Sequence, residues 1–470
     1  MMKKNVETEL KLLIDKKDLK KLLASDLLQS VIRKSSDRTV QMCSSYYDTA
    51  DLNFKNNGIA YRVRDKGDGS FEATVKTSQK NSSGLSERLE LNMPLPDDQV
   101  VLTGFKDLGL GFELTELAPA GVEKLFATEI VRTTYLLDLP QAVAELAVDN
   151  GYIRRGRAKD RIDEIEIELL EGDKGALLDF AAKIAEQVPV FIEKRSKFAR
   201  GLELAGVAAS EPRLKSRMNG AKNMRQEILK MAQVHGDNIL VLQNSMRREF
   251  TKSNAKDMLK ELLYLRSYVS FGKAFSEIDA LQQTETCIKQ LLQNLREILL
   301  LGKLQRLWQE IINAKGQLFD KSVLTARLQL LIEEKQSALS AQLHQGCLSA
   351  VVFKIISWLY NTSWENEEYL QTESTVRCRL QEWQDEFSAQ EDDAIRWLIA
   401  ENAAYIVKSM QDREMFKPVL KTKKFAAAAL EARKVMLNAM LRSLGHGSNS
   451  RVLSRDIGIL TGWLLAKNKL

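Results

Sequence analysis

Charged side chains occupy every second position near the start of the chain, within a run that is otherwise largely apolar. Glu7, Glu9 and Lys11 share one parity of residues 5–13, and the apolar residues Val6, Leu10 and Leu12 share the other. Because the side chains of a β-strand alternate between its two faces, this run predicts a strand with one charged and one apolar face. A charged face in contact with water is the common meaning of such a pattern in antiparallel sheets.

The same alternation recurs in four later segments, and the recurrence favours a second interpretation. Several strands that turn their charged faces in one direction describe the interior of a polar barrel. We therefore expect an antiparallel β-barrel with a charged interior. The later segments are Tyr61–Arg64, Thr74–Lys76, Arg88–Glu90 and Glu164–Leu169.

The first part of the chain, up to about Leu204, has the spacing of strands and turns that is typical of β-hairpins. Short β-branched runs are separated by turn signals such as residues 65–69, which is typical of antiparallel strands. Three helices are expected to interrupt these strands. They are predicted at residues 17–25, 121–128 and 175–187.

The second part of the chain has a helical pattern. Apolar residues recur at spacings of three and four in segments such as 288–312 and 425–444, and this spacing predicts amphipathic helices. A chain of 470 residues is long enough for two or three domains. We predict an α+β domain at 1–205, a linker at 206–222 and an all-α bundle at 223–470.

Net charge and composition limit the kinds of ligand and the cellular compartment that we expect for this chain. The formal net charge of +6 fits an anionic ligand, but it is too small to indicate nucleic acid. No apolar run is long enough to cross a membrane, and the charged start argues against export, so we expect a cytoplasmic protein. The scattered cysteines predict reduced core thiols and no cysteine-ligated metal. These cysteines are Cys43, Cys287, Cys347 and Cys378.

Several motifs in a fixed order resemble the CYTH superfamily, the triphosphate tunnel metalloenzymes, over about residues 3–205. The resemblance implies an eight-stranded antiparallel β tunnel with flanking helices. The first motifs are Glu7-x-Glu9-x-Lys11, Tyr46-Tyr47-Asp48-Thr49, Leu52 and the run from Gly58 to Arg64. The later ones, which resemble the family's later strands, are Lys76, Arg88 with Glu90, Arg132, the run Glu164–Glu168, and Ser196-Lys197 before Arg200-Gly201.

The helical half resembles a degenerate CHAD domain, which follows the tunnel in two-domain bacterial inorganic triphosphatases. CHAD domains are named for histidines that accompany basic residues, whereas this chain has only His235, His344 and His446. The segment Leu265-Arg266-Ser267 is a candidate remnant of a basic helix. The resemblance makes polyphosphate a possible partner of this half.

The charged residue types fit a phosphate chain held through metal. Arginine binds phosphate oxygens bidentately, but carboxylates at the same parity would repel an anion unless a divalent cation stood between them. As the resemblance implies, one Mg²⁺ or Mn²⁺ ion would hold the phosphate chain and a second would activate water for in-line attack. The expected phosphate-binding residues are Lys11, Arg62, Arg64, Lys76, Arg88, Arg132 and Lys197; the expected metal ligands are Glu7, Glu9, Glu90, Glu166 and Glu168. Among these, Glu7, Glu9, Lys11, Lys76 and Lys197 are the expected catalytic residues.

Other charged residues carry simpler interpretations. Asp48 is expected to order the turn after Tyr46-Tyr47, and Asp149 is expected to be only a hairpin residue. Glu164 lies at the start of its strand, and two interpretations of it remain: a metal ligand or a solvent-exposed residue. A basic stripe of Arg248, Lys252, Lys256 and Lys260 on one helix is read as a solvated face, with phosphate or an acidic partner as the alternative.

We therefore expect hydrolysis of inorganic triphosphate to pyrophosphate and phosphate. The absence of histidine before residue 235 excludes a histidine-based nucleophile in the tunnel, and no glycine-rich phosphate loop is present. Thiamine-triphosphatase and class IV adenylate cyclase activities remain alternatives. A further alternative, of a different class, is a polyphosphate-binding module without turnover.

Overall fold

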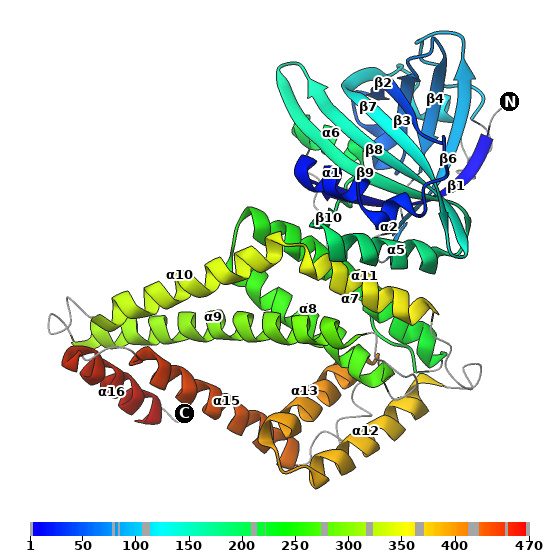
Figure 1. Ribbon diagram of the computed structural model, residues 1–470. Coiled ribbons are helices and arrows are strands. Elements are labelled where there is room, and N and C mark those ends of the chain that lie inside the picture. Colours follow the sequence, from blue (N-terminus) through cyan, green and yellow to red (C-terminus); the bar gives the residue numbers. More distant parts are fainter. Residues whose placement is uncertain are drawn as a thin grey trace. The chain divides into compact units, whose positions relative to one another are not determined.

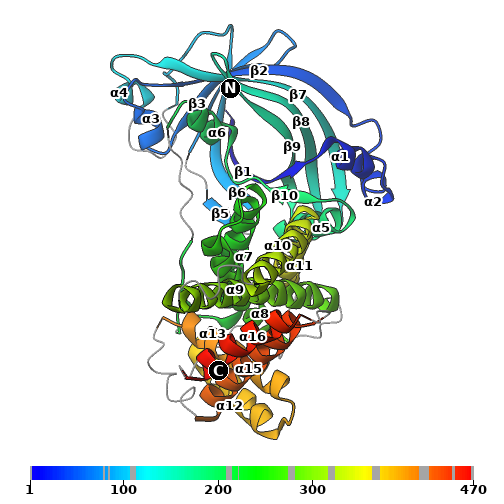
Figure 2. The same ribbon diagram turned by 90° about the vertical axis from the view of Figure 1, so that its left-hand side faces the viewer.

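The chain forms two compact units, Met1–Arg213 and Leu214–Leu470 (Figures 1 and 2). The computed structural model describes residues 3–77, 80–82, 85–105, 113–207, 214–220, 222–273, 281–315, 323–361, 371–411, 423–446 and 450–466. The division between the units falls inside the predicted linker, 206–222, part of which lies outside the described residues.

The first unit contains a closed antiparallel barrel. Its described strands pair in the order β10-β1-β9-β8-β7-β2-β3-β4-β6-β5, and β1 also pairs with β6. Eight strands therefore close on themselves, with β10 and β5 attached at the ends, which confirms the predicted eight-stranded barrel. The strands are β1 (Lys3–Ile14), β2 (Arg38–Asp48), β3 (Ala60–Asp65), β4 (Phe71–Lys76), β5 (Lys80–Ser82), β6 (Leu85–Leu95), β7 (Glu123–Leu139), β8 (Ala142–Arg155), β9 (Ala158–Gly172) and β10 (Val190–Ile192).

Strand β1 closes the barrel by changing partners along its length. Its first part pairs with β6, from Lys3 to Leu10, and its second part pairs with β9, from Glu9 to Leu13. Leu10 and Leu12 are fully buried, as the alternation predicts, whereas Val6 is 71% exposed. The charged parity therefore faces the barrel interior.

Six helices accompany the strands in the described part of the first unit. Helix α5 packs on β7, β8 and β9, where Ile165 and Ile167 of β9 are fully buried. The predicted helices at 17–25 and 175–187 are confirmed as α1 and α5. The helices are α1 (Lys16–Leu23), α2 (Asp26–Gln29), α3 (Asn53–Asn56), α4 (Leu114–Leu117), α5 (Lys174–Gln187) and α6 (Lys197–Leu204).

Two local predictions in this unit are wrong. Residues 121–128 run into strand β7, where pairing with β2 and β8 replaces the predicted helix. Ser196 and Lys197 begin helix α6 and do not belong to a strand. The Ser196 side chain accepts a hydrogen bond from the Ala199 amide at 3.1 Å, which is the usual role of serine at a helix N-terminus.

The second unit is all-helical over its described residues, as predicted. The segments 288–312 and 425–444 lie in α9 and α15, and one apolar core joins α9, α10, α15 and α16 around the buried Trp308. Helix α9 has 34 residues, so it is about 51 Å long. The helices are α7 (Met224–Arg248), α8 (Lys252–Gly272), α9 (Gln282–Lys315), α10 (Val323–His344), α11 (Cys347–Asn361), α12 (Thr372–Ala389), α13 (Asp393–Ser409), α15 (Lys423–Leu444) and α16 (Arg451–Ala466).

The basic stripe does not lie on one helix. Arg248 ends α7, and Thr251 caps a new helix, α8, that begins at Lys252. The threonine hydroxyl accepts a hydrogen bond from the Asn254 amide at 3.1 Å. The lysines Lys252, Lys256 and Lys260 therefore belong to α8 without Arg248.

The cysteines are free thiols, but they are not core residues. Cys43 and Cys378 are exposed, and Cys287 and Cys347 are partly buried, so the predicted burial is wrong. Within the described ranges, no single helix has both the length and the apolar composition of a membrane span. Helices α10 and α11 reach these criteria only together, with a bend of 54° between them.

Candidate active site

A cavity of about 410 Å³ is lined by the charged parity of the barrel strands. Among its described lining residues, eight are basic and five are acidic. All twelve residues expected to bind phosphate or metal line this one cavity. They are Glu7, Glu9, Lys11, Arg62, Arg64, Lys76, Arg88, Glu90, Arg132, Glu166, Glu168 and Lys197.

Strand register brings these charges into contact across the barrel. On β1, Glu7 lies opposite Arg88 of β6, Glu9 lies opposite Glu168 of β9, and Lys11 lies opposite Glu166. Directly opposed side chains in antiparallel strands are close neighbours. The charged residues of β1 therefore lie opposite a basic residue of β6 and opposite acidic residues of β9.

Ion pairs satisfy the carboxylates on the β6 side. Arg88 donates from Nε to Glu7 at 2.8 Å and from Nη2 to Glu9 at 2.6 Å. Lys76 donates to Glu7 at 2.9 Å and also contacts Glu90. Burial alone would raise the pKa of Glu7, but Lys76 and Arg88 outweigh burial and hold it far below its usual value.

Glu168 is a carboxylate without a counter-cation. It makes no ion pair or hydrogen bond within the described residues. Burial first, and then the negative charge of Glu7, raise the pKa of Glu168 to about 7, while Lys76 opposes the shift. Like charges that face each other in a buried place disfavour ionisation unless a cation joins them.

The residues around Glu168 fit a divalent metal by their chemistry. Glu9 stands directly opposite Glu168, and both side chains line the cavity. Carboxylate oxygens are the ligands that Mg²⁺ and Mn²⁺ prefer. A cation bound by Glu168 would oppose the burial and the nearby negative charges, Glu7 foremost, that raise the pKa of Glu168.

Arg64 shows the opposite imbalance, because it is a partly buried cation with no carboxylate partner among the described residues. Its Nε donates to the Ser44 hydroxyl at 3.1 Å, and the side chain has no carboxylate partner within the described residues. Burial, together with Arg62 and Arg132, lowers the pKa of Arg64 to about 10. The neighbouring Arg62 has a buried Nε without a hydrogen-bond partner and lies 3.8 Å from Glu90.

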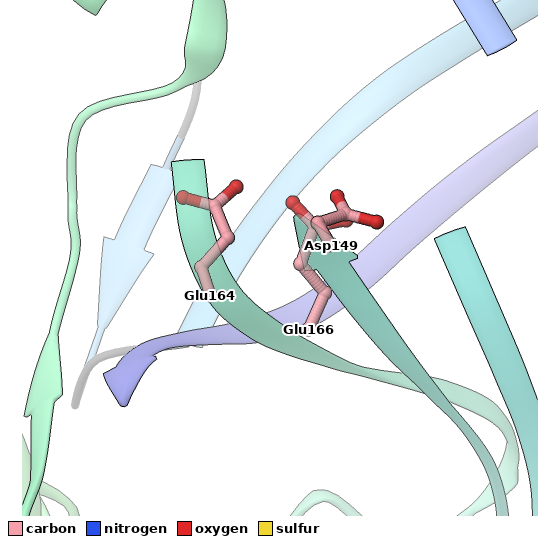
Figure 3. A group of neighbouring side chains, drawn as sticks. All are labelled: Asp149, Glu164 and Glu166. Carbon is pink, nitrogen blue, oxygen red and sulfur yellow. The ribbon is translucent and has the colours of Figure 1, made fainter. Parts of the chain in front are cut away.

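A second acidic group lies at the end of the cavity near α6. Figure 3 shows the carboxylates of Asp149, Glu164 and Glu166 gathered together, and one oxygen from each lies within 4.8 Å of the others. Three carboxylates at this spacing resemble a metal site. However, Lys197 Nζ already lies 2.8, 2.5 and 2.9 Å from Asp149, Glu164 and Glu166 respectively. This group therefore has a cation of its own, and the uncompensated Glu168 is the better place for a metal.

Helix α6 delivers Lys197 to this group by close packing against β7. A side chain at Gly201 would place its Cβ 2.2 Å from the ring of Phe126, so only glycine permits this approach. Arg195, two residues before Lys197, instead pairs with Glu193 and Glu203 and does not line the cavity.

The structure corrects the prediction for Asp149. Asp149 is fully buried and accepts two hydrogen bonds from Arg132, so it is not a simple hairpin residue. Glu164 is also buried and pairs with Lys197 and Arg200. A signal for Asp149 was present, because a two-residue turn at Pro140 and Gln141 sets a register in which Asp149 faces Arg132.

Asp48 has the structural role predicted for it. Its carboxylate accepts hydrogen bonds from the backbone amides of Thr49 and Phe54, each at 2.8 Å, and of Lys55 at 2.9 Å. These contacts fix the turn into α3. Asp48 does not line the cavity.

The histidines of the helical unit do not gather into one site. His235 is buried and its Nδ1 lies 2.5 Å from Glu261, with its ring stacked on Tyr264 at 4.3 Å. His344 Nδ1 contacts the Ser340 carbonyl of its own helix at 2.8 Å. Arg266 donates to Asn402 and Glu401.

Comparison with known proteins finds a family match within the first unit. The CYTH domain family model matches residues 5–202. An inorganic triphosphatase of Haemophilus influenzae is 31% identical over 158 residues, which cover 34% of this chain and 44% of that protein. The match therefore spans less than half the length of this relative.

Two solved structures also resemble the chain. One is a candidate adenylyl cyclase from Hippeastrum described as having a dominant triphosphatase activity, at 22% identity and a TM-score of 0.30, covering 42% of this chain and 95% of that one. The other is a candidate adenylate cyclase from Bacillus halodurans, at 18% identity and a TM-score of 0.24, covering 45% and 96%.

Proposed function

We propose that this chain, whose residues 5–202 belong to the CYTH domain family, hydrolyses inorganic triphosphate to pyrophosphate and phosphate in its barrel. The observation that carries the proposal is a pair of opposite deficits in one cavity of about 410 Å³. Among the described residues, Arg64 has no carboxylate partner and Glu168 has no cationic partner in direct contact. A phosphate chain bound together with a divalent metal supplies both.

The basic residues of the cavity would hold the phosphate chain. Arg62 and Arg64 lie two residues apart on β3, so their side chains share one face of the strand. Among the described residues, Arg64 has no carboxylate partner, and Arg62 has a buried Nε without a hydrogen bond and lies 3.8 Å from Glu90. Guanidinium forks suit phosphate oxygens, so these two are the strongest phosphate ligands in the proposal. The others proposed are Lys11, Lys76, Arg88, Arg132 and Lys197.

The acidic residues would hold the metal. Mg²⁺ or Mn²⁺, when bound, neutralises phosphate charge and lowers the pKa of water, and two ions are proposed. Glu9 and Glu168 are the strongest ligands in the proposal because they face each other across β1 and β9. Glu7, Glu90 and Glu166 complete the proposed set.

The reaction needs charge stabilisation more than covalent chemistry from the protein. Water attacks a terminal phosphorus in line, the bond from that phosphorus to the bridging oxygen breaks, and pyrophosphate leaves. Negative charge on the transferred group is spread over its outer oxygens, where Arg62 and Arg64 can donate hydrogen bonds. The protein therefore contributes position and positive charge.

A panel of four substrates tests the proposal. Triphosphate, thiamine triphosphate, ATP and long-chain polyphosphate are each incubated with the full chain and Mg²⁺ or Mn²⁺, and the products are identified. We expect phosphate and pyrophosphate from triphosphate at the highest rate. Faster cleavage of thiamine triphosphate, or cyclic AMP from ATP, would select one of the alternative activities, and tight binding without any product would select the binding module.

We further propose that the helical unit is a CHAD-like domain with weak affinity for polyphosphate. Its three histidines are dispersed, and Lys252, Lys256 and Lys260 offer only an exposed row of charge. Exposed charges are screened over about 8 Å at physiological salt, so binding should fade as salt rises. At 0.15 M salt, the full chain should bind long-chain polyphosphate with the same affinity whether or not Lys252, Lys256 and Lys260 are all changed to Gln. A large loss of affinity in this triple variant would contradict the proposal.

A further inference from the structure

We propose that Asp149 is a positioning residue that aims the guanidinium of Arg132 at the phosphate chain. The proposal rests on the proposed function of the barrel. It assigns a role to a buried carboxylate that does not itself line the cavity.

Asp149 holds Arg132 by a two-point contact. The two residues are opposite each other in the β7–β8 register. Arg132 donates from Nε to Oδ1 and from Nη2 to Oδ2 of Asp149, each at 2.6 Å. Such a bidentate pair fixes the plane of the guanidinium as well as its position.

The remaining donors of Arg132 point to its function. Nη2 also donates to Glu166 Oε2 at 2.5 Å. Within the described residues Nη1 has no hydrogen bond, yet Arg132 lines the cavity. The fork to Asp149 and the contact with Glu166 therefore occupy Nε and Nη2 and leave Nη1 for a phosphate oxygen.

Lys197 completes the arrangement from helix α6. Its ammonium has three N–H donors, and oxygens of Asp149, Glu164 and Glu166 lie within 2.9 Å of it. A divalent cation at the same point would have to displace this ammonium. Lys197 thereby neutralises the group and joins α6 to the strands that carry Arg132 and Glu166.

The geometry predicts a particular kinetic effect when Asp149 is changed. In Asp149→Asn the side chain keeps its shape, but an amide NH₂ replaces one of the two oxygens that accept from Arg132. The guanidinium then regains rotational freedom, which binding must remove. Because the Arg132 contact would exist in both the bound substrate and the transition state, its loss should raise KM more than it lowers kcat.

The experiment measures kcat, KM and metal affinity in the full chain. Asp149→Asn is compared with Asp160→Asn, a control on β9 whose carboxylate pairs with Arg200 and not with Arg132. For Asp149→Asn we expect KM for triphosphate to rise about tenfold or more, kcat to stay within about threefold, and Mn²⁺ affinity measured by calorimetry to be unchanged. Asp160→Asn should match the wild type in all three.

Two results would overturn the proposal. A loss of Mn²⁺ affinity in Asp149→Asn would make Asp149 a metal ligand, and wild-type KM would show that Arg132 needs no positioning. If circular dichroism shows that Asp149→Asn does not fold, Arg132→Lys tests the same pair, because lysine keeps the charge but loses the fork. An unchanged KM in Arg132→Lys would also overturn the proposal.

The wild-type protein separates this proposal from the proposed function. If the wild type neither binds nor hydrolyses triphosphate, the proposed function fails. If the wild type is active and Asp149→Asn has the same KM, only the role of Asp149 fails.

Discussion

The barrel and the helical unit bury charged side chains in different ways. In the barrel, charges line a cavity and two of them, Arg64 and Glu168, lack partners of opposite charge among the described residues. In the helical unit, the core around Trp308 is apolar, and Glu401 is held between Arg266 and Arg296 at 2.7 and 2.6 Å. The two charges without partners therefore mark the barrel cavity as a place for ligands, whereas the balanced group around Glu401 supports the structure of its own unit.

The sharpest test of this comparison removes one negative charge from the barrel. Glu9→Gln or Glu168→Gln keeps the side-chain shape while deleting a proposed metal ligand, so turnover of triphosphate should fall by a factor of at least about 100 at saturating Mg²⁺. The fold should survive, as judged by circular dichroism.

The matched control for this change is Glu87→Gln on β6. Glu87 pairs with Lys174 of α5 and does not line the cavity, so its loss should leave turnover nearly unchanged. Near wild-type turnover in Glu9→Gln and Glu168→Gln would mean that the charged parity of β1 and β9 binds no metal.

The next test removes the unbalanced positive charge. Arg64→Ala should weaken binding of triphosphate by about 1.5 to 3 kcal/mol, the range expected for hydrogen bonds to charged groups. Calorimetry measures the affinity, with Arg154→Ala as the control because Arg154 pairs with Glu129 on the exposed surface. Equal affinities in the two variants would show that Arg64 does not contact phosphate.

A third test addresses the helical unit, where the effect should be on stability. Glu401→Gln leaves Arg266 and Arg296 without their shared carboxylate, so the free energy of unfolding should fall by about 1 to 2 kcal/mol. Urea unfolding measures this change, and Glu382→Gln, an exposed partner of Arg379, is the control. Turnover of triphosphate should stay at the wild-type level; a large loss of turnover would break the division between the two units.

A final test concerns the pH dependence of stability in metal-free protein. The pKa of Glu168 is raised from 4.5 to about 7, so the folded state binds a proton that the unfolded state has lost in this interval. The resulting stabilisation is complete below pH 4.5 and disappears as pH rises to about 7. The Tm of the wild type, relative to Glu168→Gln, should therefore be lower at pH 8 than at pH 5. Parallel Tm profiles would show that Glu168 titrates normally.

Alternation in the sequence was enough to predict the barrel interior, because strand parity is a local property. Glu9, Arg64 and Glu168 could be assigned to one cavity from their parity and from the order of the motifs. The partners of these residues could not be assigned with the same ease, since they depend on register between distant strands. Asp149 is different, because it faces Arg132 within one hairpin, and the short turn at Pro140 and Gln141 specifies this pairing in the sequence.

The errors in local structure have a related cause. Residues 121–128 resemble a helix by composition, but both neighbours of β7 form ladders with this stretch. The helix at Ser196 was missed because its capping serine lies beside residues that alternate like a strand. In both places tertiary pairing or capping decided the structure against the local pattern.

The change of partners along β1 has a consequence for folding kinetics. The pairing of residues 9–13 with residues 164–168 joins segments about 150 residues apart, and the strands between them belong to the same barrel. Contacts so distant along the chain form slowly, and during synthesis β1 must wait until β9 has been made. We therefore expect binding of triphosphate to recover in the last phase of refolding, after most of the helical signal has returned.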